Sequence, residues 1–218
     1  MNFEDLYALL KSNANPERAA EMSAYMRNLF PFFGIPAPLR KRLFADCLKA
    51  APKGTPIDWE FVRTCFSAVG RELQYAAIYY LQSKKKLLSV DDLPCLRELI
   101  TTKSWWDTID DMHTLVGAAA LESPEGREIL LAWSLDGDMW LRRAAIICQI
   151  GRKKKTDAGL LAAVIKNQFG QREFFINKAV GWSLREYSKT DKEWVREFIA
   201  DSADSLAPLS VREASKYL

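Results

Sequence analysis

The sequence predicts an all-helical fold, a solenoid of stacked helix pairs of the HEAT-like type. Apolar side chains in stretches such as residues 72–81 recur every three or four residues, as on one helix face, and no stretch alternates convincingly as a strand would. An aromatic residue and an alanine also recur at intervals of 35 residues. The two series are Trp105, Trp140 and Phe175, and Ala144, Ala179 and Ala214. Helix pairs of this length stack into a solenoid with a concave face that binds extended partners.

Prolines, glycines and capping residues divide the helices along the chain. A helix start is expected at Asn15-Pro16, where a capping residue precedes a proline at the first helical position. Thr190 and Glu193 have the spacing of a capping box, which predicts another start. Connections are expected at residues 36–38, 52–56, 123–126, 136–138 and 208. The repeated helices are expected to begin near residues 105, 140, 175 and 210.

Length and composition limit the possible functions. At 218 residues the chain can bury a substantial core, and we expect one domain over residues 1–218. The 31 basic and 28 acidic residues leave a net charge of +3, too small to indicate nucleic-acid binding without local clustering. No apolar run is long enough to cross a membrane, and the first residues do not resemble a signal peptide. We therefore expect a cytoplasmic monomer that does not associate with membranes.

The residue types give little support to metal or cofactor chemistry. The four cysteines lie far apart with no Cys-x-x-Cys pair, and His113 is the single histidine. These features argue against a zinc site, a disulfide scaffold and a multi-histidine metal site. The sequence also lacks a serine elbow and a phosphate-cradling glycine loop. We expect no metal and no cofactor.

An aspartate interrupts the repeat pattern at position 110. Helical spacing places Trp106, Asp110 and His113 on one stripe, whereas Trp105 and Ile109 lie on the core stripe. In the other repeats a small apolar residue stands where Asp110 does. Because local rules tend to break at functional sites, Asp110 and Trp106 are candidates for chemistry. Two alternatives are acids that merely suit the helix dipole, and a Mg²⁺ site for a diphosphate, which the lack of a second acidic cluster disfavours.

A second candidate group lies at residues 174–187. Phe174, Lys178 and Arg185 share one helix face, with Trp182 at its edge, so that an aromatic ring accompanies two cations. The alternative is a core tryptophan whose basic neighbours pack their alkyl stems against it. Basic residues of the preceding repeat extend the positive charge, as phosphate contacts along a duplex require. They are Arg142, Arg143 and residues 152–155.

Taken together, these segments resemble the AlkD family of bacterial alkylpurine DNA glycosylases. The resemblance spans nearly the whole chain, and the combination of segments in this order and spacing is far more specific than any one of them. The segments are residues 25–28 with 33–35, 103–110, 140–146, 173–187 and 206–214.

The resemblance implies a HEAT-like solenoid that cradles double-stranded DNA and releases cationic N3- or N7-alkylated purines, such as 3-methyladenine and 7-methylguanine. The damaged base would not enter a protein pocket, unlike in base-flipping enzymes. By position, Asp110 is implied to be the catalytic carboxylate and Arg143 a backbone-phosphate clamp. Trp106 and Trp182 are implied to be aromatic walls against the deoxyribose. The candidate DNA-binding residues are Arg143, Lys178, Arg185, Tyr25, Phe174 and Arg152.

The implied reaction suits these residue types. Alkylation makes the purine cationic and weakens its glycosidic bond, so the base departs neutral without a general acid. Positive charge then develops on the sugar, where an indole face attracts it by about 0.5 to 2 kcal/mol. The Asp110 carboxylate would stabilise the same charge and orient the attacking water. One acid therefore suffices, in contrast to ordinary glycoside hydrolysis, which needs two.

Two positions depart from the better-known family members. Pro36 stands where a glutamine is found in them, and Gly151 where a lysine is found, with Arg152 one residue away from the missing cation. Proline offers no polar side chain, so lesion contact near the N-terminus is in question. Two other functions stay open for this reason: a weak or inactive paralogue that binds damaged or bent DNA, and a HEAT-like protein-interaction scaffold.

Overall fold

The structure, a computed structural model, describes residues 2–49 and 55–218. Over these residues it is helical, with thirteen α-helices, four short 3₁₀ helices and no strand, which confirms the predicted fold class. The chain divides into two compact units, residues 1–87 and 88–218. The expectation of a single domain over residues 1–218 stays a prediction, and the connection expected at 52–56 falls mostly outside the described residues.

In the first unit, α5 is the most deeply buried helix. It packs against α3 and α4, and it covers the stretch 72–81 whose periodicity predicts a helix. The predicted start at Asn15 is confirmed, because its side chain accepts a hydrogen bond from the Arg18 backbone N–H at 3.0 Å. The helices of this unit are α1 (Phe3–Ser12), α2 (Pro16–Tyr25), α3 (Ala37–Lys49), α4 (Trp59–Ser67), α5 (Arg71–Ser83) and the 3₁₀ helix η1 (Lys85–Leu87).

A buried carboxylate on α5 holds the segment that leads into α3. Glu72 is 0 % exposed, and its two oxygens accept hydrogen bonds from the backbone N–H groups of Phe33, Gly34 and Ile35 at 3.0, 2.9 and 3.1 Å. Gly34 has a φ of +83°, a conformation that favours glycine. Glu72 therefore supplies the partners that these buried donors would otherwise lack.

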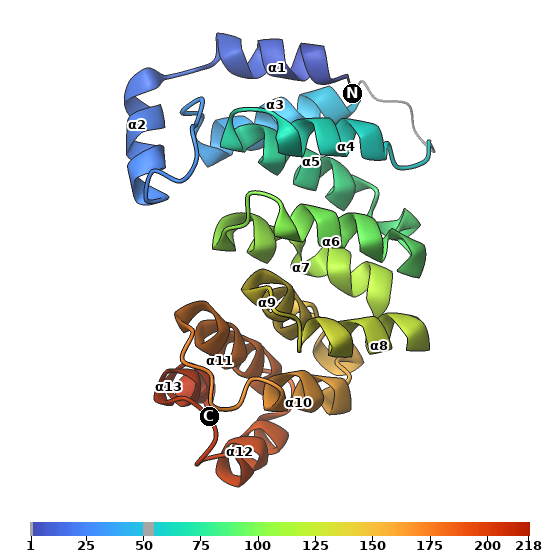
Figure 1. Cartoon of the computed structure of the whole chain (residues 1–218), viewed down its shortest axis with the longest axis vertical. Helices are drawn as coiled ribbons and strands as arrows, with labels where there is room; N and C mark the ends of the chain where they lie inside the picture. Colours follow the sequence, from blue (N-terminus) through green and yellow to red (C-terminus); the bar gives the residue numbers. More distant parts are fainter. Residues whose placement is uncertain (1, 50–54) are drawn as a thin grey trace. The chain divides into compact units, whose positions relative to one another are not determined.

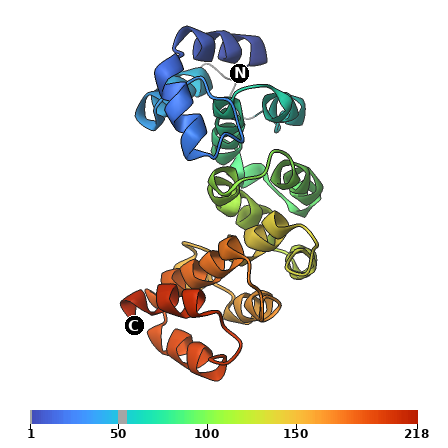
Figure 2. The ribbon, with the colours of Figure 1, turned by 60° about the vertical axis from the view of Figure 1, so that its left-hand side comes forward.

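The second unit is an array of helix pairs. Four helices, α7, α9, α11 and α13, form a row in which each contacts the next, and α8 contacts both α9 and α10 (Figures 1 and 2). The bounds are η2 (Val90–Asp92), α6 (Leu93–Thr101), α7 (Trp106–Ala120), α8 (Pro124–Trp133), α9 (Met139–Ile147), η3 (Lys153–Lys155), α10 (Ala158–Lys166), α11 (Phe174–Ser188), α12 (Lys192–Asp201), α13 (Pro208–Ala214) and η4 (Ser215–Tyr217). These four helices begin within two residues of the starts expected near residues 105, 140, 175 and 210.

The aromatic residues that mark the repeat pack against one another. Ring centroids are 5.6 Å apart between Trp105 and Trp140, 5.2 Å between Trp105 and Phe175, and 5.1 Å between Trp140 and Phe175. Such spacings are typical of favourable aromatic pairs. The helices of this row, α7, α9, α11 and α13, are called the inner helices below. The aromatic residues that recur every 35 residues therefore pack together at the starts of three successive inner helices, α7, α9 and α11.

One helix start differs from the expectation by one residue. The cap of α12 is Asp191, whose carboxylate accepts a hydrogen bond from the Trp194 backbone N–H at 3.0 Å. The capping box predicted from Thr190 and Glu193 is therefore wrong in register, although the helix is present. Aspartate caps a helix at least as well as threonine, and here it lies one residue nearer the helix.

Candidate functional site

The repeat-breaking aspartate on α7 forms an ion pair with an arginine on α9. Arg143 Nε lies 2.8 Å from Asp110 Oδ1, and Arg143 Nη2 lies 2.8 Å from Asp110 Oδ2. The third nitrogen, Nη1, donates to the backbone oxygen of Phe175 at 2.5 Å. The Asp110 side chain is 21 % exposed and the Arg143 side chain only 6 %. Two-pronged pairing of this kind fixes the carboxylate in one orientation.

Arg143, predicted to clamp a DNA phosphate, is already bonded within the protein. All three of its guanidinium nitrogens already have acceptors within the protein, on Asp110 and Phe175. Direct clamping of a DNA phosphate therefore stays a prediction, whereas contact with the candidate catalytic carboxylate is observed. The sequence offered no sign of the pair, since Asp110 and Arg143 belong to different repeats.

The single histidine joins the candidate residues of α7 to those of α11. Trp106, Asp110 and His113 are all half-buried and follow one another at helical spacing. His113 Nδ1 lies 2.6 Å from the Asp110 backbone oxygen, so this nitrogen must carry the proton that it donates. The His113 ring centroid is 6.3 Å from that of half-buried Trp182. Sequence reasoning placed His113 beside Asp110 but did not assign it a functional role.

The cations predicted on α11 converge on a glutamate of α13. Glu213, which is 7 % exposed, lies 3.1 Å from Lys178 Nζ, 2.5 Å from an Arg185 nitrogen and 3.0 Å from Lys216 Nζ. Gly181, between the two cations on the same helix face, allows this approach, because a Cβ there would lie 2.5 Å from Glu213 Cβ. The face predicted for DNA is therefore partly an interface between α11 and α13.

Glu213 lies in the repeated segment at residues 210–215, but the sequence analysis did not predict that it would bind the cations of α11. It stands 35 residues after Lys178 and 70 after Arg143, so successive inner helices carry a cation, a cation and then a carboxylate at equivalent positions. The change from a positive to a negative side chain at this repeat position is the signal in the sequence that could have identified Glu213. Three cations against one carboxylate still leave this cluster positive, which keeps Lys178 and Arg185 suitable for phosphate contacts.

Glu213 predicts a pH dependence of stability that can be tested. Hydrogen bonds from Lys216 and Lys178 lower the pKa of Glu213 from an ordinary value of 4.5 to about 2. A lowered pKa means that the stabilisation is present above about pH 4.5 and is lost as the pH falls toward about 2. We expect the wild-type melting temperature to fall across this window more steeply than that of Glu213→Gln. Parallel melting curves for the two proteins between pH 5 and about 2 would contradict this assignment.

The remaining predicted DNA-binding residues lie in different surroundings. Phe174 is 58 % exposed and packs edge-on against Phe175, next to the ion pair of Asp110. Arg152 is bound to Glu122 at 2.8 Å, and its side chain is 23 % exposed. Tyr25 belongs to the first unit, where it is 74 % exposed. Their assignments to DNA stay predictions.

The described parts of the chain hold neither a candidate metal-binding group nor a helix suited to crossing a membrane. Residues 2–49 and 55–218 contain no group of three or more histidine, cysteine or acidic side chains placed to hold a metal ion. None of the helices described there is both long and apolar enough to cross a membrane. Burial raises the pKa of Cys65 and of Cys148 to about 12, so neither buried thiol is a ready nucleophile.

Comparison with known proteins places the chain in a family and agrees with the fold. A family model described as DNA alkylation repair enzyme matches residues 6–218. The chain belongs to the DNA alkylation repair enzyme family. A solved structure described as a predicted DNA alkylation repair enzyme from Enterococcus faecalis is 36 % identical, with a TM-score of 0.83, over 94 % of this chain and 96 % of that one. None of the curated proteins matches the chain.

Membership in the DNA alkylation repair enzyme family confirms the resemblance found in the sequence at the level of the family and indicates a role in alkylation repair.

Proposed function

We propose that the protein is a DNA glycosylase that hydrolyses the N-glycosidic bond of cationic N3- or N7-alkylated purines in duplex DNA. The observation that carries the proposal is the fixed Asp110 carboxylate, which lies on the same helical stripe as Trp106 and next to a histidine that contacts Trp182. Asp110 therefore lies between Trp106, on its own helix, and His113, whose ring contacts that of Trp182. This combination suits a reaction in which positive charge develops on a sugar.

Each group has a defined part in the proposed reaction. The cationic base leaves as a neutral purine, taking the bonding electrons with it, and the deoxyribose becomes oxocarbenium-like. Asp110 stabilises that charge and accepts a proton from water as the water attacks the anomeric carbon. Trp106 and Trp182 present π-faces to the developing cation. No general acid is required, which agrees with the presence of one carboxylate at the site.

Arg143 acts through Asp110 in this proposal. Its two-pronged contact prevents the carboxylate from rotating, so the charge is already oriented when the substrate binds. Arg143 is therefore a positioning residue, and its own contact with Phe175 ties α7 and α9 to the start of α11. Each carboxylate oxygen retains a second lone pair for water or for electrostatic stabilisation.

The decisive experiment measures the release of free base. Duplex DNA methylated by dimethyl sulfate is incubated with the purified protein, and 7-methylguanine and 3-methyladenine are quantified in the soluble fraction. We expect release above the spontaneous rate, unaffected by a metal chelator. Binding without release would reject the glycosylase and support the competing function, a protein that only binds damaged or bent DNA.

Two features favour that competing function. Both oxygens of Asp110 are engaged by Arg143, and the family lysine is replaced by Gly151, which has a φ of +84°. A protein of this kind would bind damaged duplexes in a salt-dependent way without release. A protein-interaction scaffold, in contrast, gives no reason for Asp110, Arg143, His113 and Trp182 to form one chain of contacts.

His113 is expected to support the reaction by positioning Trp182. Replacing His113 with alanine removes both the hydrogen bond to Asp110 and the ring contact, and we expect base release to fall about tenfold, the loss of about 1.4 kcal/mol. His113→Phe keeps a ring against Trp182 and should recover most of the rate, whereas His113→Asn keeps only a donor and should not. Equal rates in the phenylalanine and asparagine variants would show that the ring contact is unimportant.

A further inference from the structure

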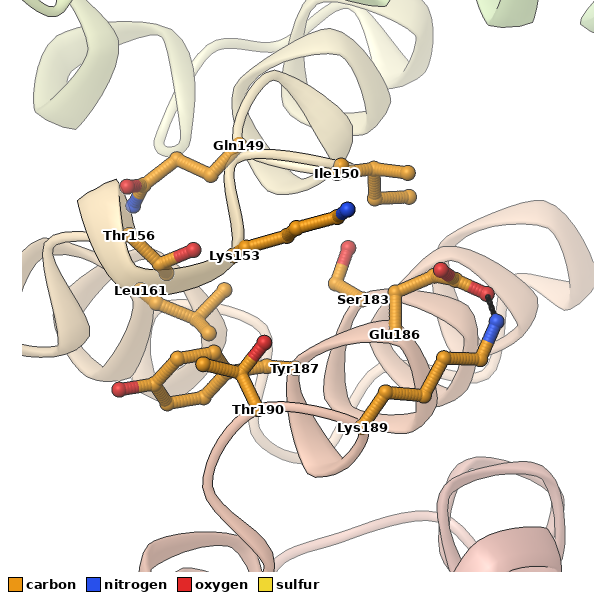
Figure 3. A pocket seen from close by; sticks show the side chains of 11 residues that line it. Gln149, Ile150, Lys153, Thr156, Leu161, Ser183, Glu186, Tyr187, Lys189 and Thr190 are labelled. Atoms are coloured by element: carbon orange, nitrogen blue, oxygen red, sulfur yellow. Dashed lines mark hydrogen bonds and ion pairs between the residues drawn. The ribbon is translucent and has the colours of Figure 1, made fainter.

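A cavity of about 280 Å³ lies in the second unit, outside the group of Asp110 and Arg143. It is enclosed by the segment 149–156, which follows α9, and by the C-terminal half of α11 (Figure 3). Its apolar wall includes Ile150 and Leu161, and hydroxyl groups of Thr156 and Thr190 line it as well. Nothing in the proposed reaction uses this cavity.

The most informative residue of the cavity is Lys153. Figure 3 shows its side chain extended into the cavity near Ile150 and Ser183. Lys189, the other cation that lines the cavity, is already paired with Glu186 at 2.5 Å, and Arg152, next to Lys153 in the sequence, is paired with Glu122 at 2.8 Å. No ion pair to Lys153 occurs among residues 55–218 or 2–49. Lys153 is thus the cation of this wall that is available to a ligand.

The backbone conformation at Lys153 is unusual for a lysine and directs its side chain to the cavity. Its φ is +54°, a left-handed conformation that a lysine adopts at a cost, and Gly151 two residues earlier has a φ of +84°. A Cβ added to Gly151 would meet no atom within 4 Å, so packing does not demand glycine there. The turn formed by these residues brings the side chain of Lys153, rather than that of Arg152, to the cavity.

We propose that this cavity is a subsite for the DNA backbone and that Lys153 is its phosphate ligand. A cation with neighbouring hydroxyl donors suits a phosphodiester oxygen, and the apolar wall suits the adjoining deoxyribose. The Glu186 carboxylate on the rim is neutralised by Lys189, so the charge that a ligand meets is positive. The inference rests on the proposed function, because it assumes that duplex DNA lies along α11.

The cavity residues on α11 give the distance of the subsite from Trp182, which is proposed to face the reacting sugar. Glu186 and Lys189 follow Trp182 by four and seven residues, which puts them on the same helical stripe, about 6 and 10 Å further along the axis. Nucleotides of one strand rise about 3.4 Å each. A strand whose sugar meets Trp182 would therefore place a phosphate at Lys153 about two or three nucleotides from the lesion.

A matched pair of variants tests the subsite. Lys153 and Lys166 are exposed lysines of the second unit, but only Lys153 lines the cavity, so the two alanine variants lose the same charge. Binding of each full-length protein to a fluorescent duplex would be measured across a salt series. We expect Lys153→Ala to weaken binding about tenfold at low salt and to reduce the salt slope by about one, with less than a twofold effect for Lys166→Ala. Equal losses would show that the lysines act only as diffuse charge and would overturn the proposal.

A second measurement locates the phosphate. Duplexes carrying one neutral methylphosphonate linkage at successive positions around a stable abasic analogue are bound by wild type and by Lys153→Ala. At one linkage, two or three nucleotides from the analogue, the difference between the two proteins should disappear. A difference that persists at every linkage, or a Lys153-dependent affinity for a free mononucleotide with unchanged DNA binding, would overturn the subsite. Failure of base release with the Lys153 effect intact would reject only the proposed function.

Discussion

Replacing Asp110 with asparagine is expected to lower base release at least about 100-fold, because the site would lose the negative charge that faces the developing sugar cation. Removal of a single preorganised electrostatic group typically costs about 10² to 10³ in rate. An asparagine has nearly the same shape and can still accept one hydrogen bond from Arg143, so the arrangement of α7 and α9 should survive. The measurement is single-turnover release of 7-methylguanine from methylated duplex at saturating protein.

The adjacent aspartate provides the matched control for this variant. Asp111 is exposed and lies one residue away on the same helix, so Asp111→Asn changes the net charge equally without changing the ion pair. It should retain nearly full activity. Thermal melting of both variants separates chemistry from folding, since breaking a pair in which Arg143 is 6 % exposed costs stability as well. Equal release by wild type and Asp110→Asn would remove Asp110 from the mechanism.

The second large effect is expected on stability, from Glu72→Ala in the first unit. Three backbone N–H groups donate to this fully buried carboxylate, and truncation leaves them without those acceptors. Each unsatisfied buried donor costs about 1 to 3 kcal/mol, so the free energy of unfolding should fall by at least about 3 kcal/mol. Urea unfolding followed by circular dichroism measures the loss.

Two further variants make the stability result specific. Glu21→Ala removes an exposed glutamate from α2 of the same unit and should change the unfolding free energy by less than about 0.5 kcal/mol. Glu72→Gln keeps one acceptor oxygen but turns an amide N–H₂ toward a backbone donor, so an intermediate loss is expected. If Glu72→Ala matched Glu21→Ala, the contacts to residues 33–35 would contribute nothing measurable.

Helix periodicity and the 35-residue repeat were enough to predict the fold class and to single out Asp110. The repeat works because equivalent positions in stacked helix pairs have equivalent neighbours, so Trp105, Trp140 and Phe175 meet in one cluster. The register of the cap at α12 was missed by one residue, since two good capping residues stand side by side at positions 190 and 191.

Partners of the candidate residues could not be predicted in the same way. Periodicity assigns a residue to a face of its own helix, but which atom of a neighbouring helix it meets depends on how closely the helices approach. Gly181 illustrates this, because its lack of a side chain is what brings Glu213 between Lys178 and Arg185. Those two cations are therefore bound within the protein as well as being candidates for phosphate.

By itself, the sequence determined that the chain is helical, that its inner helices repeat, and that a carboxylate and two tryptophans interrupt or border the repeat. The spacing of residues within each helix and the 35-residue interval between helices carry that information. Only the tertiary structure decided that Arg143 orients Asp110, that His113 reaches Trp182, and that Lys153 lines a cavity. Those contacts join side chains from different repeats, or depend on a left-handed turn, and neither is encoded in the spacing of residues along a single helix.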